Sequence, residues 1–389
     1  MTVLAPRGFV ASATAAGIKP DGQLDLALVA TEDARPVPVG AAFTSNLLAA
    51  APVQVCRAHL TASGGLSAGI VLNSGCANAA TGSEGRRAAE LTCELAARAL
   101  GVLPEHVLVC STGTIGTRLD GDRIEAALPS LIGRRGSSPD HAAAAARAIL
   151  TTDTRTKEVV VEADGFVVGG MAKGAAMLSP NMATMLAVLT SDVSSSSQAL
   201  HTAVSSAVRH SFNQMTVDGC TSTNDSVIVM ASGVGPEVQE EALAEALTAA
   251  CADLALQMVA DAEGGTKVVR ISVLGACDGG SARRAVRRVA ESQLVKASWF
   301  GEDANWGRVL SELGSAGTPF DPDRVSVAYG PVTVCRDGVA VDHDEEALRK
   351  VLGSKQFEVI CDLGLGGGSA TMISADLTPA YVELNMGRS

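Results

Sequence analysis

The central segment of this chain reads Lys173-Gly-Ala-Ala-Met-Leu-Ser-Pro-Asn-Met-Ala-Thr184-Met-Leu-Ala-Val-Leu-Thr190. Gly174 and Pro180 favour loops and turns, and the apolar run after Thr184 has the length of a buried strand. The segment therefore predicts a loop that delivers Thr184 to the edge of a strand. Loops held by a rigid scaffold often carry catalytic side chains, so this position suits a nucleophile.

Thr184 can act as a nucleophile only with help, because a threonine hydroxyl needs a base within hydrogen-bond reach. The free α-amine of an N-terminal threonine supplies that base, since its ordinary pKa of about 7.7–8.0 lies near the working pH. Exposing the amine requires cleavage of the Ala183–Thr184 bond. The Thr184 hydroxyl can start this by attacking the Ala183 carbonyl, and hydrolysis of the ester completes it. Taken alone, Thr184 also fits an ordinary β-branched strand residue.

The rest of the chain alternates apolar runs of strand length with Ala-rich helical patterns, which predicts an α/β or α+β fold. Hairpin patterns, such as 158–162 with 166–168, predict mixed or antiparallel sheets, and we expect layered sheets sandwiched by helices. The C-terminal third is predicted to end in strands at 357–363, 370–374 and 380–384, with a hairpin turn at 364–369. The predicted helices span residues 84–100, 122–132, 141–150, 195–211, 237–262, 281–291 and 344–351.

The composition limits the possible partners of this chain of 389 residues. Its net charge of −12 argues against nucleic acid and anionic membranes, which require a basic face. The longest apolar helical region, 243–262, contains Glu245, Asp253 and Asp261, which disfavours a membrane span. The N-terminus lacks the charged and apolar regions of a signal peptide. We therefore expect a cytoplasmic protein that acts on small molecules.

Several other chemistries are disfavoured by spacing. The nine cysteines and six histidines show no pattern typical of a metal site or a catalytic triad, so we expect no disulfide, no metal and no cofactor. Residues 65–69 match G-x-S-x-G but precede a strand instead of following one. The glycine-rich run 364–369 likewise precedes a strand pattern, whereas a dinucleotide site needs a helix.

Eight ordered motifs resemble the ornithine acetyltransferase family, also called bifunctional glutamate N-acetyltransferase or ArgJ, over nearly the full length. Besides 173–186, they are NSGCANAATG at 73–82, STGTIG at 111–116, TTDTRTK at 151–157, TVDGCTSTND at 216–225, DAEG at 261–264, DANWGR at 303–308 and DLTPAYV at 376–382.

The resemblance implies autocleavage at Ala183–Thr184 and a double-displacement reaction, in which Thr184 carries acetyl from N2-acetylornithine to glutamate. It implies an N-terminal-nucleophile fold built from an α chain, 1–183, and a β chain, 184–389, which stay intertwined in a heterotetramer of two α and two β chains. By matched position, Thr112 and Gly113 form the oxyanion hole. The implied substrate-binding residues are Thr152, Lys173, Thr184, Glu263, Asn385 and Ser389.

The substrates explain two of these positions physically. An amino acid with an α-carboxylate and a side-chain ammonium requires one cation and one anion, which Lys173 and Glu263 would supply. The remaining polar residues of the matched motifs are expected to give hydrogen-bonded support. These supporting residues are Asp218, Asp225, Asn305 and Arg308.

The chain departs from the family pattern in two places. Ala176 stands where the family has a glycine, and the tail Asn385-Met-Gly-Arg-Ser389 is shortened and lacks an aromatic residue. The altered tail leaves open a different acceptor, including one in secondary metabolism. Acetyl-CoA as a second donor also stays open. Two other functions fit the same residues: a self-processing amidohydrolase or peptidase, in which water accepts the acyl group, and an uncleaved paralogue that acts as a binding protein.

Overall fold

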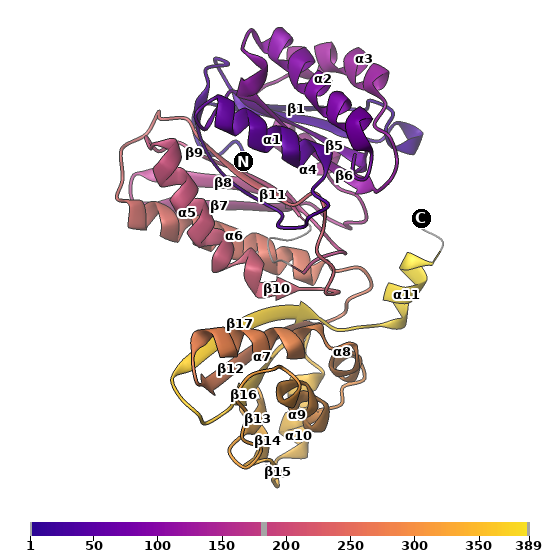
Figure 1. Ribbon diagram of the computed structural model, residues 1–389, viewed down its shortest axis with the longest axis vertical. Helices are drawn as coiled ribbons and strands as arrows, with labels where there is room; N and C mark the ends of the chain where they lie inside the picture. The colour runs from indigo at the N-terminus through magenta and orange to yellow at the C-terminus, as the bar shows by residue number, and fades with distance from the viewer. Residues whose placement is uncertain (1, 180–184, 387–389) are drawn as a thin grey trace. The chain divides into compact units, whose positions relative to one another are not determined.

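A computed structural model describes residues 2–179 and 185–386 (Figure 1). The predicted cleavage site and nucleophile, Ala183 and Thr184, and the tail residue Ser389 lie outside the described residues. The chain divides into two compact units. Unit 1 comprises residues 1–213 and 220–258, and unit 2 comprises residues 214–219 and 259–389. The predicted chain boundary at 183/184 stays a prediction, and it falls inside unit 1.

The first sheet of unit 1 has four strands in the order β1-β2-β5-β6, antiparallel except for the parallel pair β5 and β6. Helices α1 and α2 pack against β6, whereas α3 and α4 pack against β1 and β2. The bounds are β1 (Phe9–Thr14), β2 (Leu26–Thr31), β5 (Gly69–Cys76), β6 (Val107–Thr114), α1 (Ala51–Ala62), α2 (Gly82–Leu100), α3 (Gly121–Gly133) and α4 (Pro139–Ala148), with single 3-10 turns at Pro20–Gly22 and Pro104–His106.

The second sheet of unit 1 has six strands in the order β4-β3-β11-β9-β8-β7. Apolar side chains from both sheets belong to one buried core, so the two sheets pack as layers. Strand β9, which begins just after Thr184, lies between β8 and β11 and therefore joins the two predicted chains in one sheet. The bounds are β3 (Val37–Phe43), β4 (Leu66–Ser67), β7 (Lys157–Ala163), β8 (Phe166–Lys173), β9 (Leu186–Ser191) and β11 (Ser226–Ala231).

Helices α5 (Ser197–Arg209) and α6 (Glu240–Ala260) complete unit 1. Helix α5 packs on β3 and β11, and Gln257 of α6 donates a hydrogen bond to the Glu158 carbonyl of β7. Helix α6 is long and apolar enough to cross a membrane by length and composition alone, but half of that window is buried inside the protein. Its leucines contribute to the packing, with Leu247 and Leu254 fully buried, as in a core helix.

Unit 2 is built on a seven-stranded sheet in the order β10-β17-β12-β16-β13-β14-β15, with its own core around Trp299 and Tyr329. The strand bounds are β10 (Met215–Thr216), β12 (Val268–Ala276), β13 (Ser326–Tyr329), β14 (Val332–Arg336), β15 (Val339–Ala340), β16 (Gln356–Asp362) and β17 (Gly368–Ala375). A 3-10 turn spans Phe212–Gln214, and the helices are α7 (Gly279–Glu291), α8 (Gln293–Phe300), α9 (Trp306–Gly314), α10 (Glu345–Leu352) and α11 (Pro379–Asn385).

The predicted fold class is confirmed, since mixed and antiparallel sheets form layers with helices packed on them. All seven predicted helices are present, with ends shifted by a few residues. Four helices escaped prediction, namely α1, α8, α9 and α11.

Two predictions in the C-terminal third were wrong. Residues 380–384 form helix α11 and not a strand, because the Thr378 hydroxyl caps the Tyr381 amide and Pro379 occupies the first turn. Residues 364–369 are not a hairpin turn, because β12 lies between β16 and β17, parallel to the first and antiparallel to the second. The apolar β12 therefore separates β16 from β17, whereas in a hairpin these two strands would pair directly with each other.

Candidate active site

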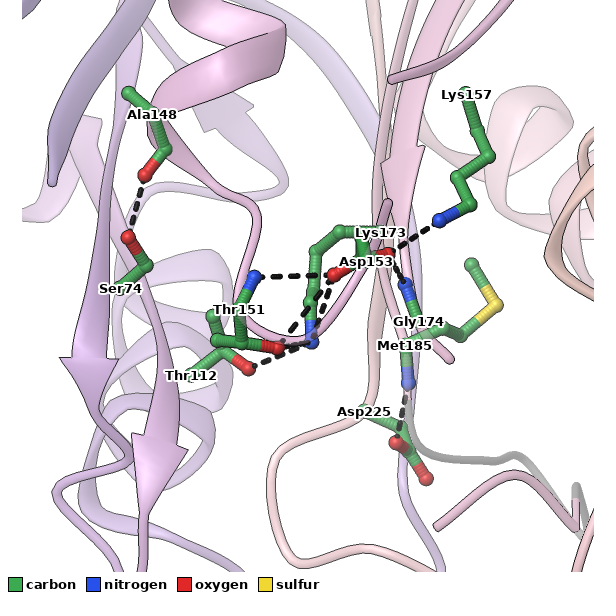
Figure 2. A network of polar contacts seen from close by, with 10 residues as sticks. All are labelled: Ser74, Thr112, Ala148, Thr151, Asp153, Lys157, Lys173, Gly174, Met185 and Asp225. Carbon is green, nitrogen blue, oxygen red and sulfur yellow. Dashed lines mark hydrogen bonds and ion pairs between the residues drawn. The ribbon is translucent and has the colours of Figure 1, made fainter. Parts of the chain in front are cut away.

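The candidate active site is built around Lys173, the last residue of β8, which is 6% exposed. Its ammonium donates hydrogen bonds to Thr112 Oγ1 at 3.2 Å and to Thr151 Oγ1 at 2.7 Å. Figure 2 shows these contacts joining β8 of the six-stranded sheet to β6 of the four-stranded sheet. Lys173 also pairs in register with Leu186 of β9, the second residue after Thr184. The buried cation therefore lies between the predicted oxyanion hole and the start of the nucleophile strand.

Asp153 holds this cation in place (Figure 2). Its Oδ1 accepts hydrogen bonds from Lys157 Nζ at 2.6 Å and from the Gly174 amide at 2.7 Å, and its Oδ2 lies 3.8 Å from Lys173 Nζ. Burial by itself would raise the pKa of Asp153, but the charges of Lys173 and Lys157 outweigh it and hold the pKa well below its usual range. The three side chains together carry one positive charge, which favours an oxyanion nearby.

Gly113 and Gly75 form a close backbone approach at the ends of β6 and β5. Both have positive φ, +132° and +99°, and a Cβ on Gly113 would lie 2.3 Å from the Gly75 carbonyl carbon. Only glycine fits at position 113, so the two strand ends can approach each other this closely. The Thr112 hydroxyl accepts from Lys173, which leaves its own proton available for an oxyanion.

Asp225, the residue before the neighbouring strand β11, anchors the start of β9. Its Oδ1 accepts a hydrogen bond at 2.8 Å from the amide of Met185, the residue after Thr184. Asp225 is 2% exposed, and this burial raises its pKa well above the usual range against the opposing effect of that hydrogen bond. The hydrogen bond from Met185 fixes the chain next to the predicted nucleophile.

Two asparagines tie the matched motifs together. Asn224 donates to the carbonyls of Ala77, at 2.6 Å, and Ser111, at 2.9 Å. Asn73 accepts from the Ser111 hydroxyl at 2.6 Å, which fixes the residue before Thr112. The four supporting residues predicted from sequence also make hydrogen bonds, including Tyr381 to Asp218, Met185 to Asp225, the Asn305 cap of α9, and Arg308 to the Leu294 carbonyl.

Unit 2 brings together two predicted substrate-binding residues. Asn385 Nδ2 donates to Glu263 Oε2 at 2.8 Å. The contact depends on Gly264, whose φ is +67° and where a Cβ would lie 2.4 Å from the Tyr381 amide nitrogen of α11. Thr378, the cap of α11, donates to the Gly264 carbonyl at 2.7 Å. The C-terminal helix is thereby held against the turn that carries Glu263.

Of the two threonines that open the 151–157 motif, Thr151 and not Thr152 contacts the cation. The Thr151 hydroxyl accepts a hydrogen bond from Lys173 and donates one to Asp153, whereas Thr152 is exposed. The prediction that Thr152 binds substrate stays untested. The departure at Ala176 is accommodated, because Ala176 has no positive φ, whereas Gly174 and Met177 beside it have φ of 157° and 55°.

The roles of Thr151, Asp153 and Lys157 were not predicted from the sequence. A signal was available, since a run of hydroxyl and charged residues directly before a strand is unusual unless those side chains meet one another. Asp225 was predicted only to give hydrogen-bonded support, because its burial comes from several elements and cannot be predicted from one segment. Lys19 gave no signal, although its charge interacts with both Lys173 and Asp153.

Comparisons with known proteins address the family of this chain. A family model described as the ArgJ family matches residues 10–387. A protein of Symbiobacterium thermophilum named arginine biosynthesis bifunctional protein ArgJ is 44% identical, covering 98% of this chain and 97% of its own. A Methanopyrus kandleri protein named glutamate N-acetyltransferase is 40% identical over 98% of each chain. A solved structure of ornithine acetyltransferase complexed with ornithine, from Mycobacterium tuberculosis, is 41% identical, with a TM-score of 0.44 over 48% of this chain and 96% of that one.

The match over nearly the whole chain confirms both the resemblance found in the eight motifs and the predicted enzyme class, an acyltransferase. The chain belongs to the ArgJ family.

Proposed function

We propose that this chain transfers an acetyl group from N2-acetylornithine to glutamate in arginine biosynthesis, through an acetyl ester on Thr184. The observation that carries the proposal is the buried Lys173, which contacts Thr112 and pairs in register with β9. A fixed positive charge beside a hydroxyl donor and a glycine backbone is the environment that a tetrahedral oxyanion requires.

Self-cleavage comes first. The Thr184 hydroxyl attacks the Ala183 carbonyl, and the oxyanion that forms is stabilised by Thr112, Gly113 and the Lys173 charge. The Ala183–Thr184 C–N bond breaks as the nitrogen takes a proton, which leaves Ala183 esterified to Thr184. Water then hydrolyses the ester and frees the α-amine of Thr184.

Acetyl transfer uses that amine as the base. It takes the proton of the Thr184 hydroxyl as the oxygen attacks the acetyl carbonyl, and it returns the proton to the departing nitrogen, so ornithine leaves as an amine. The amine of glutamate then attacks the acetyl ester, and the proton it loses restores the hydroxyl. The positive charge at Lys173 favours the neutral amine, which is the form that acts as a base. The cycle balances without a cofactor.

The substrate-binding set in this proposal is Thr152, Lys173, Thr184, Glu263, Asn385 and Ser389. Glu263 would bind the ornithine ammonium, and Asn385 would orient it. Because β8 and β9 share a sheet, the two chains would stay together after cleavage, in a cytoplasmic heterotetramer. Acetyl-CoA would be a second donor to the same Thr184, which would account for the word bifunctional in the relatives' names.

The test is the mass of the purified protein under denaturing conditions, with wild type beside Thr184→Ala. We expect wild type to separate into residues 1–183 and 184–389 and the variant to stay whole. Incubation with N2-acetylornithine should then add one acetyl group to the second fragment, and glutamate should remove it. Release of acetate at the same rate without glutamate would favour the amidohydrolase, and an intact wild-type chain without an adduct would favour the binding protein.

A further inference from the structure

We infer that Lys19 belongs to this active site and binds the α-carboxylate of the amino-acid substrates. The inference rests on the proposed function, because it names the group that would recognise one part of the proposed substrates.

The backbone of Lys19 is held rigidly in the loop between β1 and β2. Asp25, which is fully buried, accepts hydrogen bonds from the amides of Ala16 at 2.6 Å, Ile18 at 2.6 Å and Lys19 at 2.9 Å. Three amide donors converging on one carboxylate fix the loop at the point where the Lys19 side chain leaves it. A binding group on a fixed loop loses little conformational entropy when it meets a ligand.

The side chain of Lys19 runs over the glycine strand end of the site. A Cβ built on Gly75 would lie 3.1 Å from Lys19 Cγ, so the aliphatic stem occupies the space that any other residue at Gly75 would fill. Gly75 is paired in register with Gly113, and Thr112 before it accepts the hydrogen bond from Lys173. Lys19 and Lys173 therefore reach the same strand end from different elements.

The described charged groups around Lys19 include three ammonium groups, those of Lys19, Lys173 and Lys157, and two carboxylates, those of Asp25 and Asp153. Burial lowers the pKa of Lys19, and the neighbouring Lys173 ammonium lowers it further, while Asp25 and Asp153 oppose both effects. The carboxylate of Asp25 is already occupied by backbone amides, and that of Asp153 is shared by Lys157 and Lys173. Two ammonium groups that repel each other at a ligand site favour an anion between them.

The ammonium of Lys19 has capacity for that anion. Among the described residues it makes one hydrogen bond, to the Leu24 carbonyl at 3.3 Å, and an ammonium has three donors. Both proposed substrates present an α-carboxylate, which is compact, singly charged and able to accept from two donors at once. Lys19 therefore supplies the carboxylate contact, and Lys173 stays available to the reacting carbonyl.

The experiment compares N2-acetylornithine with N-acetylputrescine, the same donor without its carboxylate, in wild type, Lys19→Gln and Lys19→Arg. The exposed Lys355→Gln is the matched control. We expect Lys19→Gln to raise the KM for N2-acetylornithine and for glutamate on the order of 10- to 100-fold, the range for a lost charge-assisted hydrogen bond. The KM for N-acetylputrescine and the self-cleavage should be unchanged, and Lys19→Arg should recover part of the difference.

Equal losses for both donors would assign Lys19 a structural role as the counter-charge of Asp25 and overturn the inference, as would no loss for either donor. Calorimetric binding of ornithine and of putrescine gives a readout that does not depend on turnover. If wild type transfers no acetyl group, the proposed function fails. The Lys19 inference then stands only if wild type binds ornithine more tightly than putrescine and Lys19→Gln does not.

Discussion

Replacing Asp153 by Asn should destabilise unit 1 more than any other single conservative change in the site. The carboxylate lies between two buried ammonium groups, Lys157 at 2.6 Å and Lys173 at 3.8 Å, and Lys157 is fully buried. Asparagine keeps the size but removes the charge, so both cations lose their shared counter-ion. Breaking a buried ion pair from one side costs about 3–5 kcal/mol, a large fraction of a typical stability of about 5–15 kcal/mol.

The assay is urea denaturation in a Thr184→Ala background, which keeps the chain in one piece. Both tryptophans, Trp299 and Trp306, lie in unit 2, so fluorescence reports that unit, while circular dichroism reports both. We expect Asp153→Asn to lower the stability measured in the unfolding transition of unit 1. Circular dichroism detects this transition, and tryptophan fluorescence does not. Asp164→Asn, at an exposed position, is the control and should shift stability by no more than about 0.5 kcal/mol.

The pH dependence adds a second condition. The pKa of Asp153 is depressed in the fold, so its stabilisation is present above the unfolded pKa, near 3.9, and is lost as pH falls through the lower folded value. The difference between variant and wild type should therefore be constant from pH 5 to 7. Adding Lys157→Met should restore part of the stability, because it removes one of the two buried positive charges that Asp153 neutralises in wild type. Equal midpoints for wild type and Asp153→Asn would refute this account of the cluster.

Three further changes test other parts of the site. Gly113→Ala should abolish self-cleavage, seen as an intact mass, because its Cβ would collide with the Gly75 backbone; cleavage at the wild-type rate would contradict the close approach. Lys173→Met should slow cleavage by roughly 10²-fold or more in a time course of fragment formation, and a smaller effect would remove the cation from the oxyanion site. In Asp225→Asn a carbonyl oxygen can still accept from Met185. Since burial raises the folded pKa of Asp225, wild type should lose stability relative to the variant as pH rises above the unfolded pKa near 3.9, by up to about 1.4 kcal/mol per pH unit; a pH-independent difference would show an ionised carboxyl.

Helices with long local patterns were predictable, and short ones were not. The Ala- and Leu-rich run of α2 repeats an apolar face over 19 residues, which suffices to define a helix. Helix α11 spans seven residues and reads equally well as a strand. Its state is decided by the Thr378 cap and by packing on the Gly264 turn, more than 100 residues away in the sequence.

The residues of the site also divide into those that were predictable from the sequence and those that were not. Lys173, Thr112 and Gly113 were identified because they stand in motifs whose residue order is distinctive. Thr151 and Asp153 stand in such a motif too, but their contact with Lys173 depends on a turn that the motif does not specify.

By itself the sequence determined the family, the fold class and the identity of the predicted nucleophile, because these depend on the order of residues and on local periodicity. Only the tertiary structure decided the place of β12 between β16 and β17, the burial of Asp225 and the approach of Lys19 to Gly75. The physical reason is that strand partners, desolvation and the convergence of charges arise from contacts between segments far apart in the chain, and no single segment contains both sides of such a contact.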